Sequence, residues 1–335
     1  MNITHNISLK PYNTFGIDVA AKDFSAFRSP EELDELIRQV GKSHFMILGG
    51  GSNILLTKNY DGYVLKNDIP GIDIVHEDEH HVYVKAGAGE NWHQFVLFCI
   101  ERDLAGVENL SLIPGNVGAS PMQNIGAYGV EIKDVFHDLE AFNIRNRKIV
   151  TFTHSDCRFG YRESVFKNRH KGEYVILSVT YRLNKVPHYN TSYGAVEQEL
   201  QRMNEGVSIQ TISRAVINIR SSKLPDPANI GNAGSFFKNP TIPVKQFESI
   251  KKEHPGVPSY PQGHGLVKVA AGWLIEQCGW KGYRKGDAGV HEKQALVLVN
   301  HGNASGKEIY ELSEEVRKSV VKKFGINLER EVNVI

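Results

Sequence analysis

Residues 110–131, LSLIPGNVGASPMQNIGAYGVE, restrict the possible fold more than any other part of the sequence. The stretch contains four glycines and two prolines and has little helical or strand periodicity. Loops of this length in compact domains are usually either functional or disordered. The stretch has too many apolar residues for disorder, so we expect it to wrap around a ligand.

A second glycine-rich turn, GGGSN at residues 49–53, follows an apolar run that we expect to be a strand. Glycines let a backbone bring its N–H groups against a phosphate without interference from a Cβ atom. The turn matches neither the P-loop nor the GxGxxG fingerprint, and the run at 87–92 fails the latter because Trp92 replaces the third glycine. A tight hairpin turn is the alternative. Two such loops in one half of the chain favour a dinucleotide site outside a Rossmann fold.

Strand and helix patterns are mixed without a regular βαβ rhythm, which predicts an α+β fold. Residues 29–40 read as a helix capped by Ser29, and residues 305–325 as a helix with a Ser305–Glu308 capping box and Gly325 as its stop. We expect residues 326–335 to form a closing strand. Its apolar face would carry Ile326, Leu328, Val332 and Val334.

A chain of 335 residues is long enough for two or three domains. The stretch SSKLPDPANIGNAG holds two prolines and two glycines, and it predicts a domain boundary near residue 225. Ligands favour the clefts at such boundaries.

The balance of charged residues argues against a partner that binds through a large surface of one charge. Lys and Arg number 39 and Asp and Glu 38, so the net charge is +1, which argues against nucleic acid as a ligand. Three widely spaced cysteines predict neither a disulfide framework nor a metal site. The polar N-terminus and the lack of a roughly 20-residue apolar run predict a cytoplasmic protein without a membrane segment.

Two short segments are candidates for chemistry. NAGSFFKNP, residues 232–240, places Ser235 before two phenylalanines that we expect to anchor the loop, and a structural serine is the alternative. YRESVFK, residues 161–167, puts Arg162 among aromatics, a setting that suits carboxylate or phosphate binding, although a surface strand is the commoner reading. Periodicity alone predicts that Glu331 lies on the solvent-exposed side of the closing strand.

Six ordered segments together resemble the UDP-N-acetylenolpyruvoylglucosamine reductase family. They are GGGSN, IPGNVGASPMQNIGAYG, YRESVFK, SSKLPDP, GNAGSFFKNP and KQALVLVN. The resemblance implies an α+β fold with a two-part FAD-binding region of the vanillyl-alcohol-oxidase type and a smaller α+β substrate domain. It implies FAD-binding subdomains at 1–70, completed by 326–335, and at 71–224, with a substrate domain at 225–325.

The family also implies a reaction: NADPH reduces FAD, and the hydride then passes to UDP-N-acetylglucosamine enolpyruvate to give UDP-N-acetylmuramate for peptidoglycan. We expect a monomer with no metal. Rival readings are an oxidase of the same fold and a nucleotide-sugar binding protein without redox chemistry.

Motif by motif, the resemblance implies site residues. The catalytic set is Arg162, Ser235 and Glu331. The residues implied to hold FAD are Gly49, Gly50, Gly51, Ser52, Asn53, Pro114, Gly115, Gly118, Ala119, Ser120, Gln123, Asn124, Gly126, Ala127, Tyr128 and Arg220. The residues implied to hold substrate are Tyr161, Tyr193, Lys223, Asn239 and Gln294.

Overall fold

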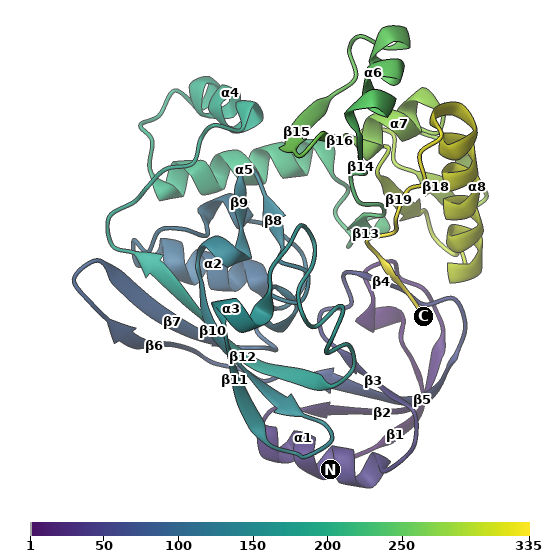
Figure 1. Ribbon diagram of the computed structural model, residues 1–335. Coiled ribbons are helices and arrows are strands. Elements are labelled where there is room, and N and C mark those ends of the chain that lie inside the picture. The colour runs from purple at the N-terminus through teal and green to yellow at the C-terminus, as the bar shows by residue number, and fades with distance from the viewer. Residues whose placement is uncertain (1) are drawn as a thin grey trace. The chain divides into compact units, whose positions relative to one another are not determined.

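The computed structural model describes residues 2–335, which form two compact units (Figure 1). The first unit comprises the chain up to Ile7 together with Ala21–Gly50 and Asp61–Ser222. The second comprises Ser8–Ala20, Gly51–Tyr60 and Lys223–Ile335. Both units combine helices with mixed or antiparallel sheets, which confirms the α+β class.

A four-stranded sheet in the order β1-β2-β5-β3 lies in the first unit. Its strands are β1 (Thr4–Ser8), β2 (Ala20–Phe27), β3 (Phe45–Leu48) and β5 (Tyr60–Asn67). Helix α1 (Pro30–Val40) begins where the sequence predicts, because Ser29 Oγ accepts the Glu32 N–H at 3.2 Å. Its apolar side chains are buried. The predicted helix over residues 29–40 is therefore confirmed.

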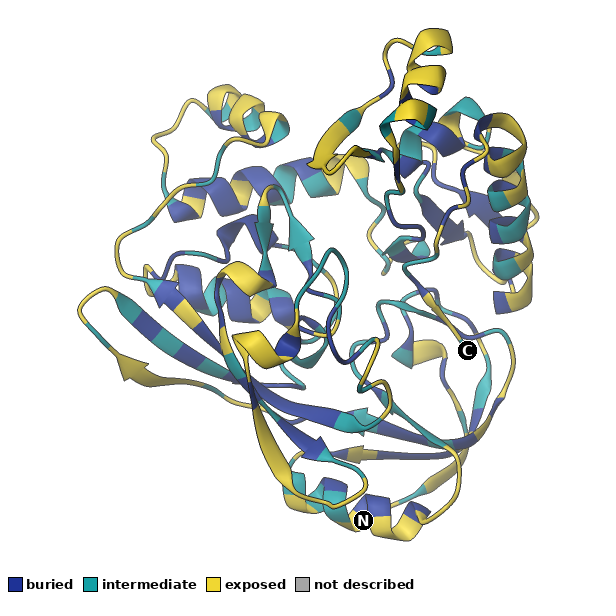
Figure 2. Cartoon of the chain, in the orientation of Figure 1, coloured by how far each residue is buried: buried dark blue, intermediate teal, exposed yellow. Residues whose placement is uncertain are grey.

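The larger sheet of the first unit is antiparallel, in the order β11-β10-β12-β7-β6. Its strands are β6 (Ile72–Glu77), β7 (His81–Gly87), β10 (Phe136–Asn143), β11 (Ile149–Thr153) and β12 (Tyr174–Asn184). The central strand β12 is buried along most of its length, whereas the edge strand β6 is mostly exposed (Figure 2). The core of the unit therefore lies around β12.

Helix α2 (Trp92–Ile100) packs on this sheet through three aromatic rings. The rings of Phe95 and Tyr181 lie 4.6 Å apart, and those of Trp92 and Tyr181 lie 5.7 Å apart. Trp92 Nε1 also donates to the carbonyl oxygen of Leu110 at 2.8 Å. Such buried aromatics contribute large apolar area and fix the geometry of their neighbours. They fix the start of the glycine-rich stretch at residue 110.

The remaining elements of the first unit are short, apart from two helices. They are η2 (Glu108–Leu110), η3 (Val117–Ala119), β8 (Gly126–Ala127), β9 (Val130–Glu131), η4 (Ile132–Asp134), α3 (His154–Cys157), α4 (Gly194–Met203) and α5 (Ile209–Lys223). Helices α4 and α5 share an apolar cluster that includes Val196, Leu200 and Val216.

The second unit contains two small antiparallel sheets. One has the order β13-β19-β18-β17, and the other has the order β14-β16-β15. The strands are β13 (Gly231–Ser235), β14 (Thr241–Pro243), β15 (Ser259–Gly263), β16 (Leu266–Val269), β17 (Arg284–Lys285), β18 (Ala288–Val290) and β19 (Val297–Asn300). The helices are η1 (Lys10–Tyr12), α6 (Val244–Glu253), α7 (Ala271–Gln277) and α8 (Gly306–Phe324).

Helix α8 has the ends that the sequence predicts. Ser305 Oγ accepts the Glu308 N–H at 3.2 Å, and a Glu308 carboxylate oxygen accepts the Ser305 N–H at 2.7 Å. Gly325 follows the helix with a left-handed φ of 65°. One side of α8 is buried and the other is exposed, as Figure 2 shows.

The C-terminal segment differs from the strand that we expected over residues 326–335. The strand β20 covers only Asn333–Val334 and pairs in parallel with β4 (Ile54–Leu55). Before it, Arg330 forms an isolated antiparallel bridge with Phe237. The expectation of a long strand was wrong because this backbone pairs with two different partners over short stretches.

The expected apolar face of the segment also ends early. Ile326, Leu328 and Val332 are buried, but Val334 is 39% exposed. The backbone bends at Val332, which breaks the alternation on which the prediction depended.

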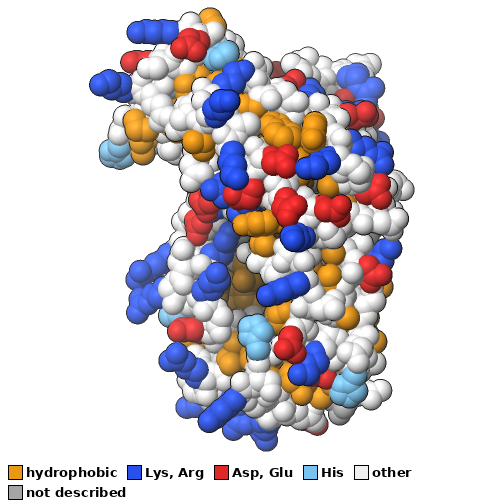
Figure 3. Space-filling model, turned by 90° about the vertical axis from the view of Figure 1, so that its right-hand side faces the viewer, with side chains coloured by type: hydrophobic (Ala, Val, Ile, Leu, Met, Phe, Trp, Pro, Cys, Tyr) orange, Lys and Arg blue, Asp and Glu red, His pale blue; other side chains and the backbone are white. Residues whose placement is uncertain are grey.

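Acidic and basic side chains lie close together on the face drawn in Figure 3, with apolar side chains among them. Within residues 2–335, no helix has both the length and the apolar character needed to cross a membrane.

Candidate active site

The glycine-rich turn after β3 packs directly on the long glycine-rich stretch. A Cβ atom on Gly50 would lie 2.6 Å from Asn116 Oδ1 and 2.8 Å from Gly115 Cα. Real Cβ contacts are essentially never this short. The two loops that the sequence singled out as phosphate cradles therefore meet within the first unit, and the contact requires glycine at position 50.

Backbone hydrogen bonds fix the first half of the long stretch. Trp92 N–H donates to Gly115 C=O at 3.0 Å, and Gly118 N–H donates to Ala88 C=O at 3.0 Å. Gly118 also approaches Ala88 closely, since an added Cβ would lie 2.6 Å from the Ala88 Cβ. The stretch is thus an ordered cradle with small residues on its inner turns.

The side chain of Asn124 holds the second half together. Its amide nitrogen donates to Glu131 Oε2 at 3.1 Å and to Gly160 C=O at 3.0 Å, and its oxygen accepts the Lys133 N–H at 3.0 Å. Asn124 is fully buried and has a left-handed φ of 44°. Ser120 is likewise buried, with Oγ 2.7 Å from the Tyr181 hydroxyl. These side chains make structural contacts inside the cradle.

Arg162 lies beside the end of the cradle. It occupies a tight turn with a left-handed φ of 56°, and Nη2 donates to the Gly126 carbonyl oxygen at 2.7 Å. Its guanidinium carbon lies 5.4 Å from the centre of the Tyr161 ring. The segment is a turn and not the surface strand weighed as an alternative. Strained backbone of this kind is common at functional sites.

A buried guanidinium lies next to the same stretch. Arg220, on α5, donates from Nε to Leu112 C=O at 3.2 Å and forms a side-chain hydrogen bond with Tyr128. Burial lowers the pKa of Arg220, and Tyr128 opposes this shift. Burial also raises the pKa of Tyr128, against the effect of Arg220.

Within the described chain, 2–335, no carboxylate pairs with Arg220. A buried cation without an acidic partner is suited to bind an anion such as a phosphate.

Tyr193 lies against the cradle through a second tyrosine. Its ring is 5.4 Å from that of Tyr128 and nearly perpendicular to it. Two asparagines tie the preceding chain down: Asn190 Nδ2 donates to Gly129 C=O at 2.9 Å, and Asn109 Nδ2 donates to Asn190 C=O at 2.9 Å. We call residues 185–193 the Tyr193 loop. Sequence reasoning missed Asn109, and its one signal was a polar residue next to apolar ones in ENLSLI.

In the second unit, Ser235 ends strand β13 at an irregular step. Gly234 has a left-handed φ of 68°, and its N–H donates to Asn232 Oδ1 at 3.0 Å. Phe236 and Phe237 are buried with 0% and 1% exposure, which confirms the expected anchoring.

Glu331 lies beside the Ser235 segment. Its N–H donates to the Phe236 carbonyl oxygen at 2.9 Å, and its own carbonyl accepts the Asn53 amide at 3.3 Å. Glu331 is half-buried and not the fully solvated residue that periodicity indicates. Lys238 is 8% exposed, and its Nζ pairs with Glu329 at 2.6 Å.

Two of the expected substrate residues each lie against the start of α7. Asn239 Oδ1 accepts the Ala271 N–H at 2.9 Å, and Gln294 Oε1 lies 2.8 Å from where a Cβ on Gly272 would be. Lys223 is exposed at the end of α5. Arg162 belongs to the first unit, whereas Ser235 and Glu331 belong to the second.

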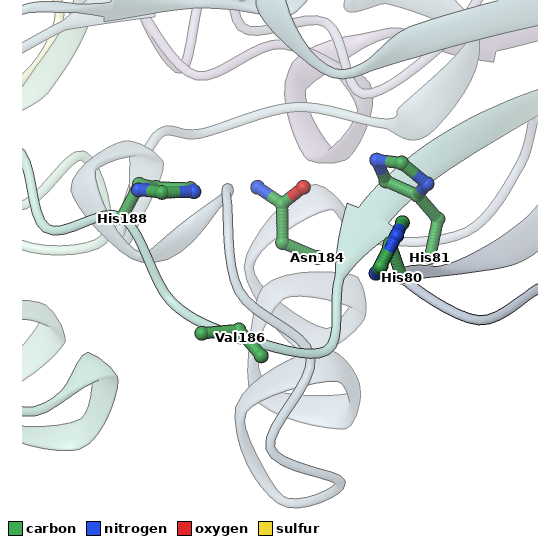
Figure 4. A pocket seen from close by; sticks show the side chains of 5 residues that line it. All are labelled: His80, His81, Asn184, Val186 and His188. Atoms are coloured by element: carbon green, nitrogen blue, oxygen red, sulfur yellow. The ribbon is translucent and has the colours of Figure 1, made fainter.

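A separate hollow of about 270 Å³ lies at the ends of β7 and β12 and contains none of the expected site residues. Its lining is His80, His81, Asn184, Val186 and His188, with the paired histidines at one side and His188 at the other (Figure 4).

A glycine-rich cradle with a buried arginine beside it suits the phosphates of a dinucleotide cofactor. A model of the FAD binding domain matches residues 24–153. A model described as the UDP-N-acetylenolpyruvoylglucosamine reductase C-terminal domain matches residues 226–335.

Relatives that match over the whole chain identify the family within the class of FAD-binding proteins. The UDP-N-acetylenolpyruvoylglucosamine reductase of Flavobacterium johnsoniae is 53% identical, with 100% of both chains covered. That of Pseudomonas savastanoi pv. phaseolicola is 51% identical over 100% of this chain and 99% of its own. The crystal structure of the reductase from Thermus caldophilus matches the fold with a TM-score of 0.69 at 24% identity, over 100% of this chain and 99% of that one. The chain belongs to the UDP-N-acetylenolpyruvoylglucosamine reductase family.

Proposed function

We propose that the chain reduces UDP-N-acetylglucosamine enolpyruvate to UDP-N-acetylmuramate with NADPH, through FAD, in the synthesis of peptidoglycan precursors. Whole-length identity of 53% to a reductase supports this reaction. The structural observation that carries it is the hydrogen bond between the Glu331 N–H and the Phe236 carbonyl. That bond joins the Glu331 backbone to the Ser235 segment, within the part of the chain that matches the reductase C-terminal domain.

The residues of the first unit fit an FAD. The close approach of Gly50 to Gly115 brings the two glycine-rich loops together, and Arg220 supplies a buried charge for a phosphate. We propose that the turn at 49–53, the stretch at 114–128 and Arg220 hold this cofactor. When bound, FAD supplies the transfer of hydride from NADPH to the substrate.

Three side chains then account for the substrate chemistry. Addition of hydride to the methylene carbon of the enolpyruvyl group builds negative charge that spreads into the carboxylate. Arg162 stabilises that charge as it develops, an electrostatic contribution that is often the largest in such reactions. The Ser235 hydroxyl donates a proton to the carbon that bears the carboxylate. Glu331 hydrogen-bonds to the developing enol.

The remaining residues bind the substrate. Tyr193, Lys223 and Asn239 contact the diphosphate, and Gln294 and Tyr161 contact other parts of the nucleotide sugar. Closure of the Tyr193 loop excludes water during hydride transfer.

The assignments of domain, assembly and compartment follow the family. We propose FAD-binding subdomains at 1–70 with 326–335 and at 71–224, and a substrate domain at 225–325. The protein acts as a monomer in the cytoplasm.

An anaerobic single-turnover experiment tests the function. The protein is loaded with FAD, reduced with NADPH, and mixed with UDP-N-acetylglucosamine enolpyruvate. We expect the oxidised flavin spectrum to return with formation of UDP-N-acetylmuramate. A flavin that stays reduced until oxygen is admitted would instead identify an oxidase, and absence of flavin binding would overturn the proposal.

A further inference from the structure

Glu331 lies in a stretch of chain that has little regular structure to hold it. The last helix ends at Phe324, and β20 begins only at Asn333. Three hydrogen bonds hold the backbone of Glu329 and Glu331: Lys238 N–H to Glu329 C=O at 2.9 Å, and the two bonds of Glu331 described above. These bonds place the backbone of Glu331.

The neighbouring side chain of Arg330 is anchored to α8 at three points. Nε donates to Ser313 Oγ at 3.1 Å, Nη2 binds the Glu314 carboxylate, and the guanidinium carbon lies 4.6 Å from the centre of the Tyr310 ring. The three helix residues are spaced i, i+3 and i+4, so they share one face of α8. A planar guanidinium can make all three contacts at once, which a lysine cannot.

Arg330 is extended where it bridges to Phe237, and successive side chains of extended backbone point to opposite sides. With Arg330 held on α8, the side chain of Glu331 must leave the backbone on the side away from that helix. We propose that Arg330 is a positioning residue that orients Glu331 for the reduction. This inference rests on the role of Glu331 under the proposed function.

A second ion pair in the segment is a weaker candidate for the same task. Lys238 pairs with Glu329, whose side chain is 70% exposed, whereas the side chains of Arg330 and Glu314 are 18% and 27% exposed. Solvent screens an exposed partner more strongly. The better-buried Arg330 anchor should therefore dominate the orientation.

The test compares two arginines that bind the same carboxylate. Arg317 pairs with Glu314 at 2.8 Å on α8 and belongs to the helix instead of the C-terminal segment. Arg330→Met is expected to slow reoxidation of the reduced flavin by substrate by about 10–100-fold, the scale for a misplaced catalytic group. The rate of flavin reduction by NADPH and the Kd for substrate should change less than about twofold. Arg317→Met should leave both half-reactions unchanged, and Arg330→Lys should recover part of the loss.

A double-mutant cycle shows whether Arg330 acts through Glu331. In a Glu331→Ala background there is no carboxylate to orient, so adding Arg330→Met should have little further effect. If Arg330→Met is equally costly in both backgrounds, or slows both half-reactions alike, the inference is wrong. If Glu331→Ala itself leaves flavin reoxidation at the wild-type rate, the proposed role of Glu331 fails instead.

A milder variant covers the case in which Arg330→Met does not fold. Ser313→Ala removes one contact to Arg330 and keeps the helix. It should slow only flavin reoxidation, by a smaller factor. Wild-type rates in this variant, with its flavin spectrum and Tm unchanged, would count against the inference.

Discussion

Ser235 is the residue whose replacement tests the chemistry most directly. Ser235→Ala should leave flavin reduction by NADPH unchanged and slow flavin reoxidation by substrate about 10²–10⁴-fold, the usual contribution of a positioned proton donor. Rapid mixing under anaerobic conditions measures both rates. Ser249→Ala, an exposed serine of α6, is the control. An equal fall in both half-reactions would make Ser235 a structural residue.

Replacing Gly50 adds a single Cβ atom and tests whether the contact between the two glycine-rich loops is needed. Gly50→Ala forces a Cβ against Gly115 Cα at 2.8 Å, so we expect about 1–3 kcal/mol of destabilisation and weaker FAD binding. Gly206→Ala is the control, because Gly206 lies outside the proposed cofactor site and its added Cβ would have no atom within 4 Å. Denaturant unfolding and flavin titration distinguish the two variants. Identical behaviour would show that the approach of the two loops is not needed.

The capping box of α8 predicts how one element responds to pH. Hydrogen bonds from the Ser305 backbone and hydroxyl lower the pKa of Glu308 below its ordinary value of 4.5. A lowered pKa in the folded state stabilises the protein above the ordinary value, and the contribution disappears as pH falls through the folded value. Wild type should therefore be more stable than Glu308→Gln at neutral pH, with the difference shrinking below about pH 4.5.

Urea unfolding of both proteins between pH 3 and 7 measures this difference. Glu311→Gln, on the same helix but outside the capping box, should show no comparable dependence on pH. A constant difference between wild type and Glu308→Gln would contradict the prediction.

The Tyr193 loop depends on Asn109, which is 1% exposed and donates to both Tyr128 C=O and Asn190 C=O. Asn109→Ala leaves two carbonyls without this donor and should release the loop at a cost of about 1–3 kcal/mol. We expect faster limited proteolysis within 185–193 and a higher Kd for substrate.

Asn218→Ala is the control for that experiment, because Asn218 binds Glu199 between α4 and α5 and does not touch the loop. Unchanged cleavage in Asn109→Ala would show that other contacts hold the loop.

Binding of FAD should stabilise the whole molecule. A ligand at one hundred times its Kd adds about 2.7 kcal/mol to the free energy of unfolding. We expect this gain as a higher Tm in wild type and a smaller gain in Arg220→Gln at the same FAD concentration. Arg214→Gln, also on α5 but exposed and paired with Glu205, should match wild type. Equal gains in all three proteins would remove Arg220 from the cofactor site.

Over the whole molecule, the sequence correctly predicted local features of the chain and the protein family. The limits of α1 and α8 follow from Ser29, Ser305 and Gly325, because a helix cap acts within a few residues of its own position. The burial of Phe236 and Phe237 follows from their apolar nature. The α+β class was predicted from the mixed strand and helix patterns, and the reductase family from six ordered motifs.

The C-terminal segment shows why other features were not predicted. Alternating residues indicate a strand, but a strand also needs a partner, and the partner of Arg330 is Phe237 while that of Val334 is Leu55. Asn109 was missed for the same reason, since its hydrogen bond to Asn190 joins residues 81 positions apart.

The sequence by itself determined the helix ends, the glycine turns, the buried aromatic anchors and the family. Each of these depends on neighbouring residues or on the order of motifs along the chain. The tertiary structure alone decided which of these parts meet: Gly50 with Gly115, Asn109 with Asn190, and Arg330 with α8. Such contacts form only once folding has paid the entropy of bringing distant residues together, and local periodicity contains no information about which distant partner is chosen.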